Sequence, residues 1–510
     1  MQNHPSTYSW IPPESSAYVG YTWNAFLPAF KGIERGKSIS LPYKPTPLQP
    51  PTDYQGDYYI DEFSDLKIKE QWNELKVTNP KLAQSILANV NTIIALQFRT
   101  TGTVDPFGKI DPHQEVNLRD IRRPIYFGSS PLYEEIAALE EKTYTVEFTV
   151  PKENASPIRS HDTLPIKLRG WFIKGDGIPI EQSHKIHALV IFNAGASIEI
   201  TAMQHPQDPL YKYNVMTKEY ERIPYPNANA QTENWGTKQW RQFLYAFHKA
   251  GFDVLAVDKR GHGISGGITA ISAGDMAEDQ FLMLDQLQSG HGLRILTPDG
   301  ETLVDDKAAG VLIRHIPSKE IPVIIGGASQ GSIIASFVMQ KNFVGWKEFT
   351  KLQSSTTVLP KKYNIKAAVL LGDLTGGIGY NTNPDLLNLY LEGAFRIESG
   401  IMTLPSSEVL ANVHAWPAVF LGKGMWDEFQ SAEGTFEVYR RANSFKKLLF
   451  VRGPHSQNAW GPDLIEYVTK KMIKFSVRSI TNPRPFSHTF KSLKEAILNS
   501  PPYWEPSSRP

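Results

Sequence analysis

The 510-residue chain contains no cysteine, no excess of charge of either sign and no long apolar run. Without cysteine, disulfides, thiol catalysis and thiolate metal sites are excluded. The compartment stays open, because a cysteine-free protein suits the cytosol and the periplasm alike. Lysine plus arginine number 53 against 52 for aspartate plus glutamate, and no basic stripe stands out, so nothing indicates nucleic-acid binding. No run is long enough to span a bilayer, and we expect no transmembrane segment.

The first residues, MQNHPSTYSW, lack the basic start and apolar stretch of a secretory signal. The localisation is therefore open between the cytoplasm and, if a signal has been removed, the periplasm or the exterior. The composition is 41% hydrophobic and 21% charged, which is ordinary for a globular protein.

Three parts of the chain differ in pattern. Residues 1–141 are an N-terminal extension, Pro- and aromatic-rich at first and helical in pattern further on. Residues 142–475 alternate strand-like and helical segments, which predicts an α/β domain. Two insertions, at about 201–235 and 375–416, interrupt it, and the second lies where a cap is expected. Residues 476–510 are expected to form a C-terminal tail.

Eight short, mostly apolar runs in this domain predict strands. They cover residues 142–151, 165–177, 187–196, 252–263, 321–332, 365–377, 417–429 and 447–455. Because the runs alternate with helical patterns, we expect an α/β fold of about eight strands, a mostly parallel sheet with helices on both faces. Nearly all of the runs end in glycine and a polar residue. In such sheets ligands bind beyond the carboxyl ends of the strands, so one edge is predicted to carry the chemistry.

The sequence GASQG at 327–331 matches the G-x-S-x-G pattern of a nucleophile turn. Small residues two before and two after Ser329 let a strand and a helix approach closely, so that the hydroxyl projects from a strained turn. The helix N-terminus then supplies donors for a developing oxyanion, and the backbone N–H of Gln330 is the expected one. An ordinary tight turn with an incidental serine is the alternative. The apolar strand before Ser329 and the apolar helix after it favour the nucleophile.

The pattern also predicts the chain order serine, acid, histidine. His455 follows the last strand-like run, and an imidazole near its unperturbed pKa of about 6.5 can accept the hydroxyl proton at neutral pH. Asp427, after the preceding run, is the favoured acid, because a carboxylate there can accept the second imidazole N–H. Its neighbour Glu428 and the earlier Asp373 are the rivals.

A second oxyanion donor is expected in the segment NAGAS at 193–197, where small residues let backbone N–H groups face a substrate carbonyl. We assign it to the N–H of Ala196 or of Gly195. The charged turn DKRGHG that begins at Asp258 is interpreted as structural, with Asp258 and Arg260 pairing with backbone or with each other.

The turn DKRGHGISGG, the elbow GGASQGS, the acid strand LGKGMWDEF and the closing GPH together resemble the α/β-hydrolase superfamily of esterases, lipases and peptidases. The resemblance covers about residues 142–475. It implies an eight-stranded, mostly parallel sheet, a covalent acyl-enzyme and no cofactor or metal. It also implies Ser329 as nucleophile, Asp427 as acid and His455 as base. The sequence departs from many esterases in reading NAGA where they have HG or HGGG.

These features predict a carboxylesterase-like serine hydrolase that acts on a small-molecule ester. A peptidase or amidase, an acyltransferase, and a hydrolase-fold binding protein without activity are the alternatives.

Overall fold

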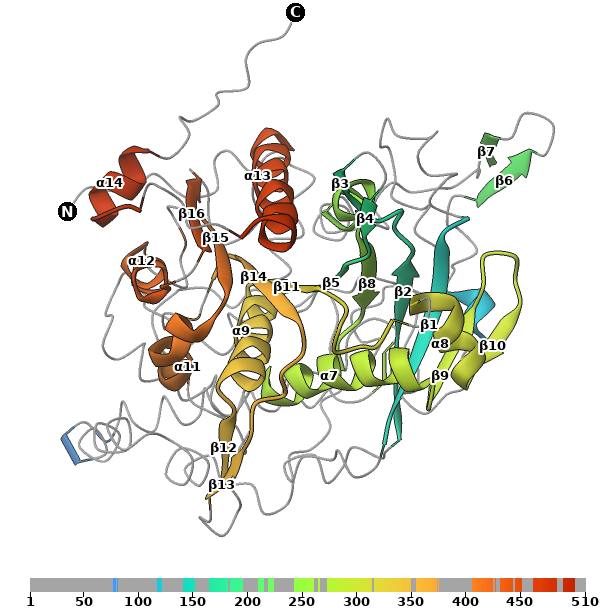
Figure 1. Cartoon of the computed structure of the whole chain (residues 1–510), viewed down its shortest axis with the longest axis horizontal. Helices are drawn as coiled ribbons and strands as arrows, with labels where there is room; N and C mark the ends of the chain where they lie inside the picture. The colour runs from blue at the N-terminus through green and yellow to red at the C-terminus, as the bar shows by residue number, and fades with distance from the viewer. Residues whose placement is uncertain are drawn as a thin grey trace, which may run out of the picture.

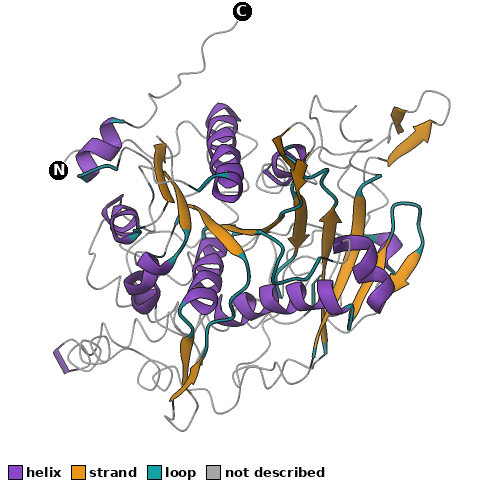
Figure 2. Ribbon diagram, viewed as in Figure 1, coloured by secondary structure: helices purple, strands orange, loops and turns teal. Residues whose placement is uncertain are grey.

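The structure, a computed structural model, consists of one large sheet covered by helices (Figures 1 and 2). It describes residues 77, 78, 80, 117–121, 141–151, 165–181, 184–195, 210–214, 219–223, 243–260, 265–266, 273–313, 316–349, 355–373, 375, 406–424, 427, 432–443, 445–451, 462–483 and 489–499.

Ten strands make the sheet. They are β1 (Thr143–Val150), β2 (Ile166–Ile173), β5 (Leu189–Asn193), β8 (Asp253–Val257), β9 (Leu293–Leu296), β10 (Thr302–Val304), β11 (Val323–Ala328), β14 (Ile365–Leu371), β15 (Ala418–Gly424) and β16 (Phe445–Val451). Their order is β10-β9-β1-β2-β8-β5-β11-β14-β15-β16. The six strands from β8 to β16 run parallel, and the four from β10 to β2 pair antiparallel. The predicted α/β class and mostly parallel sheet are confirmed.

All eight predicted strands are present, but the sheet has ten strands rather than about eight. The additional two, β9 and β10, extend the antiparallel edge next to β1. They have four and three residues, which is too short for a period-2 pattern to stand out from a turn. Hairpins β3–β4 (Ile178–Glu181, His184–Ile186) and β12–β13 (Trp346–Phe349, Ser355–Val358) were not predicted either.

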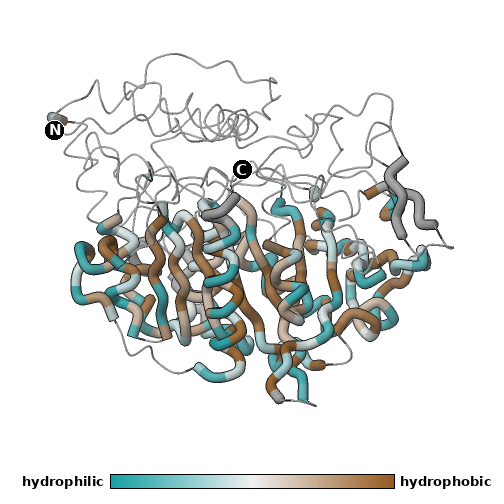
Figure 3. The backbone as a smooth tube through the Cα atoms, turned by 90° about the horizontal axis from the view of Figure 1, so that it is seen from above, coloured by the Kyte–Doolittle hydropathy of each residue, from teal (hydrophilic) through white to brown (hydrophobic). Residues whose placement is uncertain are grey.

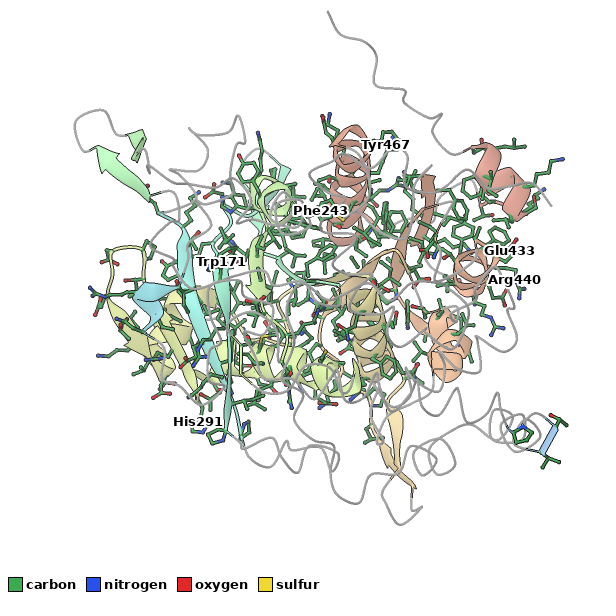
Figure 4. The ribbon with its side chains drawn as sticks, turned by 180° about the vertical axis from the view of Figure 1, so that it is seen from behind. Trp171, Phe243, His291, Glu433, Arg440 and Tyr467 are labelled. Atoms are coloured by element: carbon green, nitrogen blue, oxygen red, sulfur yellow. The ribbon has the colours of Figure 1, made fainter. Side chains whose placement is uncertain are left out.

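Helices cover both faces of the sheet. They are α7 (Ala273–Ser289), α8 (Asp305–Ile313), α9 (Gln330–Phe343), α11 (Ser406–Asn412), α12 (Ala432–Arg441), α13 (Pro462–Thr481), α14 (Leu493–Leu498) and a helical segment at 243–249. One apolar cluster joins the sheet to α7, α8, α9, α11, α12 and α14. The other joins it to α13 and to 243–249, and it contains Trp171 and Phe243, labelled in Figure 4.

The central strands alternate between the two clusters, residue by residue. In β5, Leu189 and Ile191 belong to the first cluster, whereas Val190 and Phe192 belong to the second. Strands buried on both faces carry apolar residues at every position, which is why they read as continuous apolar runs in the sequence. Apolar stretches accordingly run through the body of the molecule in Figure 3. Each fully buried aliphatic or aromatic side chain contributes about 1.5 to 3 kcal/mol.

The strand order reverses direction beside β5. Strand β8 lies on one side of β5, and the chain then returns to place β11 on the other side. The helix after β5, at 243–249, packs in the second cluster, while α9 after β11 packs in the first. Helices leaving toward opposite faces leave a crevice beyond the carboxyl ends of the two strands, where open α/β sheets bind ligands.

Parts of the predicted extension, insertion and tail pack against the body. In the extension, Leu118 and Ile121 are buried, and Arg119 Nη2 donates to the carbonyl oxygen of Gly300 at 2.6 Å. Residues 406–416, at the end of the second predicted insertion, form α11 and the short helix η6 (Val413–Ala415), which join the first cluster. Helix α13 runs past the predicted tail boundary at 476.

The first insertion contains the hairpin β6–β7 (Leu210–Asn214, Glu219–Ile223), drawn at the upper right of Figure 1. Within the part of the chain that the structure describes, no helix is both long and apolar enough to cross a membrane.

Candidate active site

Ser329 stands between the last residue of β11 and the first residue of α9, with φ 54° and ψ −121°. Few side-chain-bearing residues adopt a positive φ, because the Cβ atom then crowds the backbone. The geometry is held from both sides. The N–H of Ser329 donates to the carbonyl oxygen of Leu371 at 2.9 Å, and Ser332 Oγ donates to the carbonyl oxygen of Ser329 at 2.6 Å. The serine thus occupies a strained strand-to-helix turn.

The two glycines of the motif are required by close backbone contacts. A Cβ atom on Gly327 would lie 1.9 Å from the carbonyl oxygen of Gly331, so the strand and the first helical turn touch there. A Cβ atom on Gly331 would lie 2.0 Å from the carbonyl oxygen of Asn193, at the end of β5. Both distances are far below any real carbon–oxygen contact, so only glycine fits at either position. The second contact places the loop after β5 directly against the elbow.

Helix α9 begins at Gln330, immediately after the serine, and is buried from Gln330 to Asn342. An α-helix leaves its first N–H groups without partners inside the helix, and its dipole adds a partial positive charge at this end. The N–H groups of Ser332 and Ile333 donate to the carbonyl oxygen of Ser329, at 2.8 and 3.4 Å. The predicted donor Gln330 therefore lies at a helix N-terminus next to the Ser329 hydroxyl.

The predicted second donor loop is fixed by polar contacts. Asn193 Nδ2 donates to the carbonyl oxygen of Gly326 at 3.1 Å, which ties the end of β5 to β11. Lys259, after β8, donates from Nζ to the carbonyl oxygens of Ala194, at 2.8 Å, and of Gly195. Gly195 is buried, and Ala196 lies outside the described residues.

The favoured acid, Asp427, is buried and follows β15 on the same sheet edge. Its N–H donates to the carbonyl oxygen of Gly424 at 3.3 Å, and its Oδ2 lies 2.6 Å from Lys423 Nζ. The rival Asp373 is also buried, and its Oδ1 accepts from the N–H of Thr375 at 2.9 Å. Lys423 Nζ reaches the main-chain oxygen of Asp373 at 3.3 Å, so both aspartates contact one ammonium.

The predicted base, His455, and the second rival acid, Glu428, lie outside the described residues. The strand before His455, β16, is described and ends at Val451. It is parallel to β15, so its carboxyl end lies at the edge that carries Ser329 and Asp427.

The charged turn after β8, described as far as Arg260, makes structural contacts, but the partner of Arg260 is not one that was predicted. Arg260 forms a two-point ion pair with Asp279 of α7, at 2.5 and 2.6 Å, and both side chains are buried. Ser265 Oγ donates to the main-chain oxygen of Asp258 at 2.6 Å and accepts from the N–H of Arg169 at 2.8 Å. The turn is thereby joined to α7 and to β2.

Sequence reasoning missed two buried lysines, Lys259 and Lys423. Both stand at the carboxyl ends of strands that are otherwise apolar, and both are buried. A lysine in such a run predicts a partner, because a buried ammonium must be paired or hydrogen-bonded. The sequences LAVDK and FLGKG carried that signal. They do not identify the partners, because these depend on which loops lie next to each lysine in the folded chain.

No protein-family model and no curated protein matches this sequence. Among solved structures, an esterase from Pyrococcus furiosus is similar over 72% of this chain and 99% of its own, at 18% identity and a TM-score of 0.35. A monoacylglycerol lipase from Paleococcus ferrophilus covers 59% of this chain and 96% of its own, at 11% identity and a TM-score of 0.35. Dipeptidyl peptidase 4 from Porphyromonas gingivalis covers 61% of this chain and 33% of its own, at 14% identity and a TM-score of 0.32.

Proposed function

We propose that this chain, whose mostly parallel ten-stranded sheet carries a strand–turn–helix elbow at Ser329, is a serine hydrolase of the α/β-hydrolase fold that cleaves carboxylic esters. The observation that carries the proposal is the backbone of Ser329, held at φ 54° in the turn between β11 and α9. Strain of this kind persists only where the surrounding structure enforces it, and it is concentrated at functional sites. The turn also lies at the end of β11, beside the point where the strand order reverses, which is where open α/β sheets bind ligands.

In the proposed reaction, Ser329 Oγ attacks the ester carbonyl carbon while the imidazole of His455 takes the hydroxyl proton. The negative charge that forms on the carbonyl oxygen is stabilised by the N–H of Gln330 and by the N–H of Gly195 or Ala196. His455 then gives its proton to the departing alcohol, leaving the acyl group on the serine. Water, deprotonated by His455, releases the acid and restores the hydroxyl.

The chain is long enough for His455 to reach the serine. Strand β16 lies three strand positions from β11, which corresponds to about 14 Å at about 4.8 Å per strand. His455 is the fourth residue after Val451, and four extended residues span about 13 to 14 Å. The side chain adds further reach, so the assignment needs no change in the sheet.

The role of Asp427 is supported by its position and its charge. It follows β15, between the elbow strand and the strand that precedes His455. Asp373, which follows the neighbouring strand β14 and whose Oδ1 accepts from the N–H of Thr375, stays the alternative. Asp427 is the acid we assign to orient the imidazole.

Labelling with a fluorophosphonate probe tests the proposal directly, because the probe reacts only with an activated serine. We expect a single adduct on Ser329 in the wild-type chain and none in Ser329→Ala, with loss of p-nitrophenyl ester hydrolysis. Ser476→Ala is the matched control, since Ser476 is also fully buried, its Oγ donates to the carbonyl oxygen of Met472 at 2.9 Å within α13, and its loss should not affect labelling. An unlabelled wild-type chain, or a Ser329→Ala variant with full turnover, would reject the proposal.

Esters, anilides and acyl acceptors offered to the enzyme that has not been treated with the probe then separate its reaction class. We expect hydrolysis of a p-nitrophenyl ester to exceed that of the matching p-nitroanilide. Faster turnover of the anilide would indicate an amidase, and acceleration by an added alcohol would indicate an acyltransferase.

A further inference from the structure

A buried lysine joins the end of β8 to the loop after β5. Lys259 is 7% exposed, and its Nζ donates to the carbonyl oxygens of Ala194, at 2.8 Å, and of Gly195. Because β5 and β8 are parallel neighbours, their loops leave the same edge of the sheet. The lysine side chain crosses from one loop to the other and holds two successive peptides.

The direction of these carbonyl groups fixes the direction of a neighbouring N–H group. A trans peptide places its C=O and N–H on opposite sides of the chain. The carbonyl of Ala194 faces Lys259 Nζ, so the N–H of Gly195, in the same peptide, points away from the ammonium. Alanine and glycine offer no polar side chain that could hold the loop, so this constraint comes from Lys259.

The loop held by the lysine is in direct contact with the elbow. The carbonyl oxygen of Ala194 lies only 2.8 Å from the position that a Cβ atom of Gly331 would take. Asn193 Nδ2 adds a hydrogen bond to Gly326 in the strand before the serine. The carbonyl oxygen of Ala194 thus contacts both the ammonium of Lys259 and the first turn of α9. A shift of this peptide therefore changes the surface beside Ser329.

We propose that Lys259 is a positioning residue of the oxyanion site, which orients the peptide that presents the Gly195 N–H. This inference rests on the proposed serine-hydrolase function. An ammonium bound to the carbonyl of a peptide also polarises that peptide, which strengthens the hydrogen bond its N–H donates. The benefit grows as negative charge develops on the substrate oxygen, so Lys259 acts on the transition state more than on substrate binding.

Replacing the lysine tests this role in the full-length protein. In Lys259→Met, which keeps most of the side-chain volume and removes the donors, we expect kcat for a p-nitrophenyl ester to fall on the order of 100-fold, the loss typical of one oxyanion donor. KM should stay within about twofold, and the fraction of protein that a fluorophosphonate finally labels should be unchanged. Lys259→Arg, which keeps the charge and the donors, should recover part of kcat.

Lys446→Met is the matched control. Lys446 also donates from Nζ to two carbonyl oxygens, those of Tyr439 and Ala442 at 2.9 and 2.6 Å, but at the end of α12. Its kcat should stay within about twofold of wild type. Hydrogen–deuterium exchange should rise over residues 193–195 only in Lys259→Met and over 439–442 only in Lys446→Met.

Three outcomes overturn the inference while leaving the proposed function intact. They are a Lys259→Met kcat within about threefold of wild type, a loss fully explained by a smaller labelled fraction, and an equal kcat loss in Lys446→Met. A wild-type chain that neither labels at Ser329 nor hydrolyses any ester would reject the proposed function, and this inference with it.

Discussion

Lys423 Nζ lies 2.6 Å from a carboxylate oxygen of Asp427, and the two side chains are 0% and 1% exposed. A buried carboxylate needs a cation or several donors, so this ion pair accounts for Asp427 by charge balance alone. A carboxylate held in place beside the sheet edge is also what orienting a histidine requires. Activity and stability therefore have to be measured together to separate the two roles.

The choice between the two candidate acids can be made with isosteric variants. Asp427→Asn removes the charge that stabilises the imidazolium and fixes its tautomer, so we expect kcat for a p-nitrophenyl ester to fall about 10³- to 10⁴-fold. Asp373→Asn keeps an oxygen for the N–H of Thr375, and its kcat should stay within about threefold. Steady-state kinetics on both variants provide the test, and the reverse pattern would assign the acid to Asp373.

A double variant distinguishes catalysis from charge balance. Lys423→Met alone leaves Asp427 as a buried charge without this partner and should destabilise the protein by about 3 to 5 kcal/mol. Lys423→Met combined with Asp427→Leu replaces the pair with apolar side chains, which should recover most of that loss. Urea unfolding measures the stability. Because the double variant has no carboxylate at position 427, its ester turnover should be lost even though its stability is largely restored. Turnover at the wild-type rate would show that Asp427 serves only the ion pair.

Relief of the strained elbow should raise stability and abolish activity together. Glycine adopts φ 54° and ψ −121° freely, so Ser329→Gly should increase the free energy of unfolding by about 1 kcal/mol. Ser332→Gly, the same change inside α9, should lower it by about 1 kcal/mol or more, because glycine disfavours helix and the Oγ bond to Ser329 is lost. Thermal unfolding of the two variants measures whether the stability of each rises or falls relative to wild type. A stability loss in Ser329→Gly would contradict strain at this position.

Much of the fold could be predicted because the buried strands have a distinctive pattern. Strands β5, β11 and β14 are apolar at nearly every position, since both of their faces are covered, and small residues end the strand or follow it at the same sheet edge. The strained turn at Ser329 was predictable for a related reason, because the glycines at 327 and 331 are imposed by backbone contacts.

The contacts between loops could not be predicted in the same way. Lys259 and Ala194 are 65 residues apart, and their contact exists only because β8 pairs with β5. The partner of Arg260 depends similarly on how α7 crosses the sheet to bring Asp279 beside it. The strand order thus decides which partners these two charged residues contact, and the sequence pattern does not reveal it.

The contact between the elbow and the loop after β5 predicts that Gly331 tolerates no side chain. The Cβ atom of Gly331→Ala would lie 2.0 Å from the carbonyl oxygen of Asn193, so the variant should lose more than about 3 kcal/mol of stability or fail to fold. Gly300→Ala is the control for backbone conformation, because Gly300 has φ 90° but a Cβ atom there would meet only Arg119 Nη2 at 3.8 Å. It should cost about 1 to 2 kcal/mol. Equal losses of stability in Gly331→Ala and Gly300→Ala would show that the elbow and the loop after β5 can move apart to accommodate a side chain.

A buried ion-pair cluster on the antiparallel side predicts a pH-dependent stability. Burial raises the pKa of the Glu147 carboxyl, but hydrogen bonds and charges from Arg294 and Arg169 outweigh it, and the pKa lies below its usual value. Its contribution is therefore fully present above the unfolded pKa of about 4.3 and is lost as the pH falls through the lower folded value. Glu147→Gln should cost about 3 to 5 kcal/mol at pH 7, because Arg169 stays buried, and the difference from wild type should shrink below about pH 4.

Glu437→Gln, in an exposed pair, should change stability by less than about 1 kcal/mol at pH 7. Urea unfolding at several pH values measures these stability differences. A difference between Glu147→Gln and wild type that grows as the pH falls would contradict the lowered pKa of Glu147.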